Sequence, residues 1–379
     1  MFFIAFISVN LFIGLFLGIN AWAAFSQLIH NKLIFWLIVS SVTQIYWISR
    51  LSAYRFAVEI PALLYFLAAS LFAFCIMALF IVTGADIILL FTRIIKPLNF
   101  VYQFIKTHSV QTGILVTALV LCCYFAGLFI ANFPVETHYK ISVNKPLGAE
   151  NVKIIMVSDL HITTFTRTGA INSLVERINK LDADIVLLGG DIIDGGMRPF
   201  VEKDLSGFFS RLKSRYGVYM VMGNHEYYGG DTDSVVKGVM SAGIRVLRDE
   251  KLFLEPLGIT LIGRDDISSA IFKGHPRAAL KELMSGADLS KPIIVLDHQP
   301  QKKPVREALT NGVDLQLSGH THSGQFFPFN LVVKKMYINS WKLWCEGSFN
   351  LIVSCGFGTW GPPIRTASYS EIVVIELVI

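Results

Sequence analysis

Four long stretches without a single charged side chain occupy the first third of the sequence. They cover residues 1–31, 33–49, 60–85 and 109–135. A helix needs about 20 mostly apolar residues to cross the roughly 30 Å hydrocarbon core of a bilayer. Only eight charged residues fall within 1–135, whereas the whole chain has 33 basic and 28 acidic ones. The sequence therefore predicts a membrane region over residues 1–135 and a globular part after it.

The number and direction of the predicted spans depend on the second stretch and on the loop charges. This stretch is short and contains Trp36, Tyr46 and Trp47, and aromatic residues gather at membrane interfaces. We expect about four helices, or three if the stretch is interfacial. No Lys or Arg precedes Lys32, which favours an uncleaved anchor over a signal peptide. Basic residues are nearly balanced between alternate loops, so the positive-inside rule gives no orientation.

Charge and cysteine content argue against several other classes of protein. The formal net charge is +5 at pH 7 and no run of five Lys or Arg occurs, so nucleic acid is not an expected partner. The five cysteines form no CxxC pair, and three of them fall in apolar runs. Neither a disulfide framework nor a zinc ribbon is indicated. Cys345 and Cys355 could pair or could both be reduced.

From about residue 151 the pattern changes to short β-rich runs that alternate with amphipathic stretches. This alternation is typical of layered α/β domains. We expect one helix over residues 171–181 and the end of another over 208–215. Strands are expected over residues 153–158, 185–188, 218–222, 259–262, 293–296, 313–317, 351–354 and 372–377. The pattern predicts two sheets flanked by helices in a domain of residues 151–379, after a linker at 136–150.

Residue types that bind metals recur directly after five of the predicted strands. The five motifs are SDLH at 158–161, GGD at 189–191, GNHE at 223–226, DHQP at 297–300 and GHTH at 319–322. Strand ends form the ligand crevice in layered α/β folds, so these side chains can converge. Taken singly, each motif could be a helix cap or a turn. Five strand-terminal motifs are hard to explain by independent structural causes, so we expect one shared site.

The residue types in these motifs suit a pair of divalent cations. Two ions about 3.5–4 Å apart need a bridging carboxylate together with nitrogen and oxygen ligands on each ion. Asp-x-His and His-x-His place two donors at positions i and i+2, which can face one side together in an extended backbone. Mixed imidazole and carboxylate ligands favour manganese, with iron or zinc as alternatives, over calcium.

In this order, the motifs SDLH, GGD, GNHE, DHQP and GHTHSGQ resemble those of the calcineurin-like metallophosphoesterase superfamily, over most of residues 151–379. The resemblance implies a four-layer αββα sandwich with a dinuclear metal centre. It assigns Asp159, His161 and His322 to one ion, Asn224, His298 and His320 to the other, and Asp191 as the bridge. Ser323 stands where many relatives have glycine, which affects the shape of the loop and leaves the ligand count intact.

Roles at the substrate can also be assigned. By the same resemblance, Asn224 would bind substrate as well as metal, and His225 beside it would touch the phosphate and protonate the leaving oxygen. Arg365 is a candidate phosphate clamp because a guanidinium can bind two oxygens at once, and a structural ion pair with Glu371 is the alternative. Two cations would polarise the phosphoryl oxygens and make hydroxide available near pH 7, so no covalent enzyme intermediate is required.

The membrane region and one further segment suggest where the substrate resides. A lipid-linked phosphate or diphosphate is confined to the interface, whereas a hydrolase of soluble nucleotides gains nothing obvious from four apolar spans. The segment 326–344 combines aromatic residues with Lys334 and Lys335, a composition that favours contact with lipid headgroups. Alternatively, it is a β-hairpin whose aromatic side chains pack in the core.

One lipid-directed group of calcineurin-like enzymes cleaves UDP-2,3-diacylglucosamine to lipid X and UMP in lipid A biosynthesis. The polytopic anchor is similar to a variant of that activity in some Gram-negative bacteria. This resemblance implies a multi-pass protein of the bacterial inner membrane with a cytoplasmic catalytic domain. The alternatives are a broad phosphodiesterase or phosphatase acting on phospholipids or cell-envelope polymers, and a non-catalytic membrane scaffold. All seven expected ligand positions are filled, which favours an enzyme.

Overall fold

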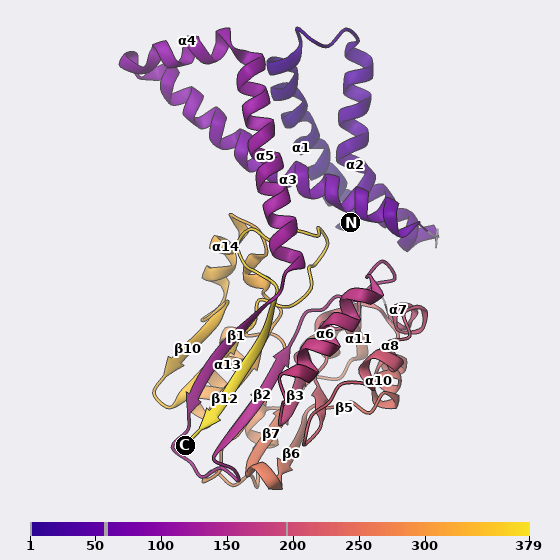
Figure 1. Cartoon of the computed structure of the whole chain (residues 1–379), viewed down its shortest axis with the longest axis vertical. Coiled ribbons are helices and arrows are strands. Elements are labelled where there is room, and N and C mark those ends of the chain that lie inside the picture. Colours follow the sequence, from indigo (N-terminus) through magenta and orange to yellow (C-terminus); the bar gives the residue numbers. More distant parts are fainter. Residues whose placement is uncertain (1, 57–59, 195) are drawn as a thin grey trace. The chain divides into compact units, whose positions relative to one another are not determined.

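A computed structural model of the chain describes residues 2–56, 60–194 and 196–379. The chain divides into two compact units. We call the first, Met1–Phe129 with Gly361–Ile364, the apolar unit, and the second, Ile130–Trp360 with Arg365–Ile379, the α/β unit (Figure 1).

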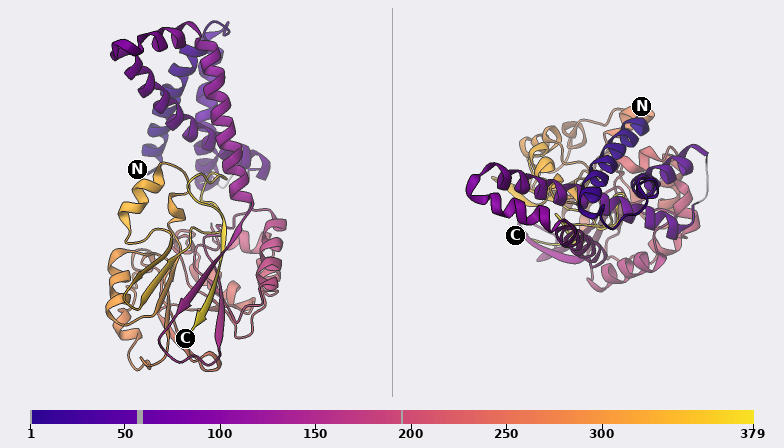
Figure 2. Two further views of the ribbon diagram at one scale, coloured as in Figure 1. Left: turned by 60° about the vertical axis from the view of Figure 1, so that its left-hand side comes forward. Right: turned by 90° about the horizontal axis from the view of Figure 1, so that it is seen from above.

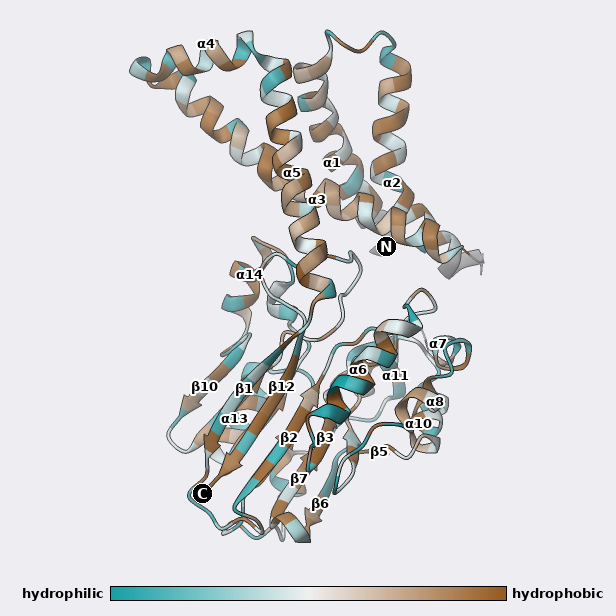
Figure 3. Cartoon of the chain, viewed as in Figure 1, coloured by the Kyte–Doolittle hydropathy of each residue, from teal (hydrophilic) through white to brown (hydrophobic). Residues whose placement is uncertain are grey.

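The apolar unit is built from helices that have long runs of apolar side chains (Figure 3). They are α1 (Phe2–Phe25), α2 (Lys32–Phe56), α3 (Ala62–Ile94), the short η1 (Lys96–Leu98), α4 (Asn99–Thr107) and α5 (Ser109–Asn132). Four segments are long and apolar enough to cross a bilayer, namely Ile7–Phe25, Lys32–Ser52, Ala62–Ile94 and Ser109–Asn132. The stretch that could have been interfacial is therefore a fourth candidate span.

Helix α3 is longer than a bilayer core requires. Its 33 residues correspond to about 50 Å at 1.5 Å per residue. The helix continues past Asp86 to Ile94 without a break, and the amphipathic α4 follows after η1.

The α/β unit contains two six-stranded sheets. The first has the order β1-β12-β2-β3-β4-β5 and the second the order β10-β11-β9-β8-β7-β6. The strands are β1 (Val135–Ser142), β2 (Asn151–Val157), β3 (Ile185–Leu188), β4 (Val218–Met220), β5 (Arg245–Val246), β6 (Glu250–Leu254), β7 (Ile259–Gly263), β8 (Ile293–Leu296), β9 (Leu315–Ser318), β10 (Lys342–Glu346), β11 (Phe349–Val353) and β12 (Glu371–Val378).

Helices connect the strands and cover the outer faces of the sheets (Figures 1 and 2). They are α6 (Thr168–Lys180), α7 (Met197–Glu202), α8 (Leu205–Phe209), α9 (Asn224–Tyr228), α10 (Thr232–Ser241), α11 (Ser268–Lys273), α12 (Leu280–Leu283), α13 (Lys302–Thr310) and α14 (Phe329–Met336), with the short 3-10 turns η2 (Glu255–Leu257) and η3 (His322–Gly324).

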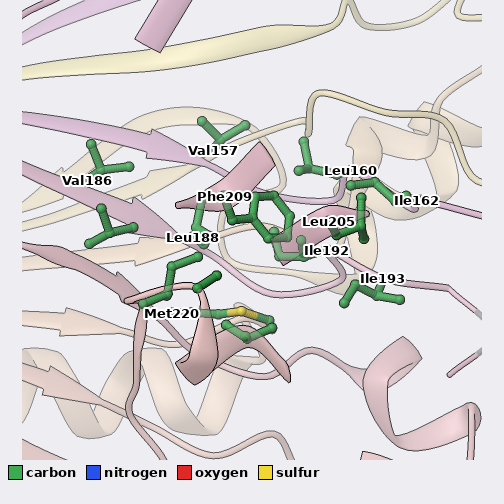
Figure 4. Close-up of a cluster of buried hydrophobic side chains, with 14 of the residues drawn as sticks. Val157, Leu160, Ile162, Val186, Leu188, Ile192, Ile193, Leu205, Phe209 and Met220 are labelled. Atoms are coloured by element: carbon green, nitrogen blue, oxygen red, sulfur yellow. The ribbon is translucent and has the colours of Figure 1, made fainter. Parts of the chain in front are cut away.

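Three hydrophobic clusters separate four layers. Because side chains alternate along a strand, β2 sends Ile155 and Val157 to the cluster beneath α6, α8 and α10 (Figure 4). It sends Ile154 and Met156 to the cluster that fills the space between the sheets. A third cluster joins the outer face of the second sheet to α12 and α13. The expected four-layer αββα sandwich is confirmed.

The expected linker at residues 136–150 is wrong in its first half. Residues Val135–Ser142 form β1, which pairs in parallel with β12 along its whole length, from Val135 opposite Glu371 to Ser142 opposite Val378. Most of its side chains are exposed or half-buried, because β1 is an edge strand, so it lacks the continuous apolar run that marked the central strands. The edge strands β6 and β10 and the two-residue β5 were missed for the same reason. The expected helix end at 208–215 lies earlier, since α8 ends at Phe209.

Strand directions define one edge of the unit where the functional motifs gather. β2, β3 and β4 are parallel, as are β7, β8, β9 and β11, so the carboxyl ends within each of these two groups lie together. We call the edge at the carboxyl ends of β2, β3, β4, β8 and β9 the ligand edge. β12 is antiparallel to β2, with Val373 opposite Met156, and β1 is parallel to β12. The first residues of β1 therefore lie at the ligand edge.

Candidate metal centre

The seven side chains expected to bind metal lie at the ligand edge, on loops that follow strands of both sheets. The first sheet supplies Asp159, His161, Asp191 and Asn224, and the second supplies His298, His320 and His322. Six of the seven are almost completely buried, and His320 is partly buried. The convergence expected from the motifs is therefore present in the fold.

Asp159, His161 and His322 form the first group of potential ligands. One ligand atom from each residue lies within 4.8 Å of those of the other two. The Nε2 atoms of His161 and His322 are 3.0 Å apart, and Nε2 of His322 is 3.6 Å from Oδ1 of Asp159. Two imidazoles and a carboxylate that converge in this way can hold one divalent ion.

Asp191, His298 and His320 form the second group, again with ligand atoms within 4.8 Å of one another. Oδ2 of Asp191 is 3.1 Å from Nε2 of His298. The same oxygen is 3.9 Å from Nε2 of His161 in the first group. Asp191 thus lies between the two groups, which is the position that a bridging carboxylate needs.

Two buried polar atoms support the assignment of a second ion. Asn224 Oδ1 and His320 Nδ1 have no hydrogen-bond partner among the described residues. Burying such atoms without a partner costs free energy, and a divalent cation removes that cost. The donor set is imidazole, carboxylate and amide, which suits manganese, iron or zinc. The residues present therefore fit two divalent cations.

The loops that hold these ligands adopt unusual backbone conformations. Five of the ligand residues have positive φ angles, namely Asp159 (55°), His161 (46°), Asp191 (52°), His320 (70°) and His322 (46°). For residues other than glycine this conformation costs roughly 1–3 kcal/mol each and is found mainly at functional sites. The surrounding structure must therefore hold these loops firmly.

Glycines in the motifs give the ligands their space. A Cβ on Gly319 would lie 2.3 Å from Oδ2 of Asp159, and a Cβ on Gly190 would lie 2.6 Å from Nδ1 of His298. Any side chain at either position would push a ligand out of place. The glycines of GGD and GHTH are therefore part of the site, since they let ligand side chains from one sheet approach the backbone of the other.

Burial and neighbouring charges set the protonation of the imidazoles. Burial and the charge on His298 lower the pKa of His320 to about 3. Burial, His161 and Arg365 hold the pKa of His322 well below its usual value. Burial also opposes protonation of His298, but the carboxylate of Asp191 outweighs it and raises the pKa of His298 well above the ordinary value. His320 and His322 are thus neutral at pH 7, as metal ligands must be, whereas a cation bound at His298 would displace the proton of that imidazole.

His225 lies beside the two groups with a carboxylate behind it. Nδ1 of His225 is 3.1 Å from Oδ1 of Asp194, and the ring lies 4.6 Å, centroid to centroid, from that of His161. Burial opposes the charged form of His225, but the contact with Asp194 and the charge of Asp191 raise its pKa to about 9. His225 is therefore protonated at pH 7, which suits a proton donor.

Asp194 was not among the residues expected from the sequence. Contacts with His161 and His225 overcome its burial and lower its pKa, so Asp194 is ionised. Its only signal in the sequence is a carboxylate three residues after Asp191, beyond the end of the GGD motif.

Glu226, the last residue of the GNHE motif, also had no predicted role. Its buried carboxylate accepts hydrogen bonds from the backbone N–H groups of Asp191 (3.0 Å), Ile192 (2.6 Å), Ile193 (3.0 Å) and Gly223 (2.7 Å). Glu226 therefore joins the loop after β3 to the loop after β4, and so fixes Asp191 relative to Asn224.

Arg365 is fully buried and contacts a metal-ligand residue. Its exposed fraction is 0%, and its Nη2 lies 3.2 Å from Nδ1 of His322. The guanidinium donates to Ser368 Oγ and to the carbonyl oxygens of Gly356 and Gly358. The carboxylate of Glu371 instead accepts from Thr137, Ser354 and the N–H of Cys355. These contacts favour a positioning role for Arg365, and its binding of substrate stays a prediction.

The variant Arg365→Ala separates these two roles. If Arg365 positions His322, we expect the affinity for Mn²⁺ to fall by about 10–100-fold, as for other residues behind a metal ligand, with KM unchanged at saturating Mn²⁺. Titration of Mn²⁺ against hydrolysis of a soluble phosphodiester measures both. Ser368→Ala should have a smaller effect of the same kind, since Ser368 contacts both Arg365 and the carbonyl oxygen of His322. A higher KM with unchanged Mn²⁺ affinity would instead support a phosphate clamp.

The aromatic and basic segment 326–344 is divided between two environments. Residues Phe329–Met336 form α14, in which no side chain is buried. Trp344 belongs to β10 and packs against the core near Phe349, and Trp341 packs against Tyr369. The hairpin alternative therefore describes the second half of the segment, while the first half is an exposed helix.

Comparisons with known proteins agree with this geometry. The family described as calcineurin-like phosphoesterase matches residues 152–324. An uncharacterized metallophosphoesterase of Aquifex aeolicus is 32% identical over 243 residues, which are 63% of this chain and 90% of that protein.

Two further relatives are longer than the matched region. An uncharacterized metallophosphoesterase of Helicobacter pylori is 35% identical over 240 residues, 60% of each chain. A Bos taurus protein named transmembrane protein with metallophosphoesterase domain is 30% identical over 258 residues, which are 64% of this chain and 57% of that protein. The match thus spans about 60% of the length of both relatives.

Proposed function

Because this chain belongs to the calcineurin-like phosphoesterase family, we propose that it is a metal-dependent phosphoester hydrolase and that its substrate is a phosphoester or diphosphate carried by a membrane lipid. The family and the ligand groups at the ligand edge support this enzyme class. The candidate spans and the transmembrane relative support membrane association. The proposal goes beyond the family in placing the phosphoester on a membrane lipid.

One topological observation carries this proposal. The last candidate span ends at Asn132, and β1 begins at Val135. The first residues of β1 lie at the ligand edge. Within the α/β unit, Ser370 Oγ donates a 2.8 Å hydrogen bond to the carbonyl oxygen of Ala131. The chain therefore joins its last candidate span to the α/β unit at the edge that carries the metal ligands. Only residues 133 and 134 separate the ligand edge from this span along the chain, which supports a substrate in the same membrane.

The side chains of the site have two roles in hydrolysis, which are metal binding and proton donation. Two divalent cations held by the ligand groups would polarise the phosphoryl oxygens and lower the pKa of water. Asp191 is positioned to serve both groups, and its Oδ1 also accepts the backbone N–H of His225 at 2.8 Å. That bond fixes His225 beside the ligand groups, and the contact with Asp194 favours the protonated form of the imidazole. His225 can then donate a proton to the leaving oxygen.

Replacing His225 by glutamine should slow hydrolysis by about 10²–10⁴-fold, the usual contribution of a general acid, while bound metal stays unchanged. Because the pKa of His225 is raised, its proton-donating form is present at low pH and is lost as pH rises through about 9. Cations bound at the neighbouring ligands would oppose protonation, so we expect the loss of kcat/KM at or below that pH. A pH profile of both proteins checks this, since the variant should lack the alkaline limb. The same limb in the variant would exclude His225 as the acid.

As a specific substrate we propose UDP-2,3-diacylglucosamine, cleaved to lipid X and UMP. The test incubates the purified protein and Mn²⁺ with this lipid and, separately, with bis-p-nitrophenyl phosphate. Release of UMP and lipid X would support the lipid A assignment. Turnover of the artificial diester alone would reject it and favour a broader activity on phospholipid or cell-envelope phosphoesters. Turnover of neither substrate, in a sample that holds two metal ions, would favour a non-catalytic scaffold.

The proposed location is the bacterial inner membrane, with the α/β unit in the cytoplasm, where UDP-linked lipids are available. A reporter fused after Ile379 gives the side of the membrane on which that unit lies. A periplasmic result would eliminate UDP-linked substrates but would leave other lipid-borne phosphoesters in place. Metal analysis of the purified protein would decide between manganese, which we propose, and iron or zinc.

A further inference from the structure

Helix α14 presents large apolar side chains to the outside of the α/β unit. Phe327, just before the helix, is 60% exposed, and Leu331, Val332 and Met336 are 52%, 57% and 57% exposed. Lys334 and Lys335 are exposed on the same helix. We call Phe327, Leu331, Val332 and Met336, together with these two lysines, the α14 face. Contiguous exposed apolar surface in a folded domain usually marks a site of contact with a partner or a membrane.

The α14 face is attached to the loops of the metal centre. α14 follows η3, which begins with His322. The N–H of Phe327 donates to Thr366 Oγ1 at 3.1 Å, and the N–H of Thr366 donates to the carbonyl oxygen of Gln325 at 3.0 Å. Tyr337, directly after the helix, lies 6.4 Å from His320 between ring centroids. Both ends of α14 are therefore held next to metal-ligand residues at the ligand edge.

The composition of the face matches the surface of an anionic bilayer. Apolar side chains can enter the boundary between headgroups and acyl chains, while lysines stay at the level of anionic headgroups. Lys334 and Lys335 lie in the last turn of α14, where the helix dipole has its negative end. They therefore stabilise the helix whether or not lipid is present. The chain enters this same edge at Val135, shortly after its last candidate span ends at Asn132.

We propose that the α14 face inserts into the interfacial layer of an anionic bilayer and holds the metal centre at the depth of the lipid phosphates. This inference rests on the proposed function, because it explains how a lipid-borne phosphoester would reach the site without leaving the membrane. It also assigns a specificity role to α14: the helix favours substrates in a bilayer and has no effect on soluble ones.

The test compares variants of the full chain in nanodiscs that contain phosphatidylglycerol. Each protein is given a p-nitrophenyl phosphodiester of diacylglycerol in the disc and, separately, soluble bis-p-nitrophenyl phosphate. The double variant Val332→Asp/Met336→Asp should hydrolyse the lipid substrate at least about ten-fold more slowly, since two apolar side chains lose their burial, and the soluble substrate at the normal rate. Met240→Asp, which changes a 54% exposed side chain on α10, is the matched control and should affect neither rate.

The lysines provide an independent arm. Lys334→Gln/Lys335→Gln should slow the lipid reaction by about five-fold for each lysine lost in anionic discs, and should have no effect in phosphatidylcholine discs. Amide exchange over residues 327–336 should be slower in anionic discs than in phosphatidylcholine discs. Equal exchange in both discs, or a wild-type rate on the lipid substrate in both double variants, would overturn the inference.

Failure of the proposed function has a different outcome. In that case the unaltered protein would hydrolyse only the soluble diester, while amide exchange would still report whether α14 is inserted. Protection of residues 327–336 by a soluble protein or by a second copy of the chain in the absence of lipid would mean that a protein, and not a bilayer, covers the face.

Discussion

Replacing Asp191 by alanine should abolish hydrolysis and reduce bound metal from two ions to at most one. Asp191 contributes to both ligand groups, with Oδ2 3.1 Å from Nε2 of His298 and 3.9 Å from Nε2 of His161. Loss of residues that only support a metal ligand costs about 10–100-fold, so loss of a shared ligand should exceed that range. The activity of the variant should fall below about 1% of the original and should not return with added Mn²⁺.

Metal analysis and hydrolysis of bis-p-nitrophenyl phosphate measure this outcome. Asp314→Asn is the matched control, because Asp314 is also a buried carboxylate, with Lys145 Nζ 2.6 Å away and the N–H of Ile293 2.7 Å away. Ile293 begins β8, so Asp314 lies at the opposite end of that strand from His298. The control should lose stability but keep two metal ions and its activity. Two ions in Asp191→Ala would show that Asp191 is not the bridge.

The sequence predicted those parts of the protein in which each segment carries its own signal. Central strands such as Ile185–Leu188 and Ile293–Leu296 are short continuous apolar runs, because both of their faces are buried. The ligand motifs follow such strands directly, so the parallel arrangement of the first sheet brings Asp159 and Asp191 together, and the packing of the second sheet against it adds His298. Charge-free stretches likewise marked the candidate spans before any contact was known.

Other features depend on contacts that no local pattern reveals. Strand β1 has a half-exposed edge position, so its sequence resembled a linker. Arg365 was a candidate phosphate clamp or an ion-pair partner of Glu371, and only the fold shows that it is buried against His322. Asp194 is the carboxylate partner of His225, which comes from a different loop and meets Asp194 only in the folded protein. Glu226 accepts three of its four backbone N–H groups from residues 191–193, more than 30 residues earlier in the chain, and side-chain spacing does not reveal such contacts.

The same dependence on distant contacts makes Glu226 the second position at which we expect a very large effect. Its carboxylate is 1% exposed and accepts four backbone N–H groups, three from Asp191–Ile193 and one from Gly223. Glu226→Gln replaces one acceptor oxygen with an amide group that donates, so at least one of these N–H groups meets another donor. Each buried N–H left unpaired costs roughly 1–3 kcal/mol, and the loop that holds Asp191 at φ 52° loses its support.

We therefore expect Glu226→Gln to lower the free energy of unfolding by about 3 kcal/mol or more, since hydrogen bonds to a charged group are among the stronger ones. Metal affinity and hydrolysis should be lost with it, although Glu226 is not a metal ligand. Thermal unfolding with and without Mn²⁺ measures the first effect and metal titration the second.

Asp184→Asn is the control for this variant. Asp184 precedes β3, away from the metal centre, and accepts the backbone N–H of Lys153 at 2.8 Å. That variant should lose stability while retaining both ions, because its hydrogen bond does not reach a ligand loop. Full activity in Glu226→Gln would mean that the ligand loops hold their strained conformation without this carboxylate.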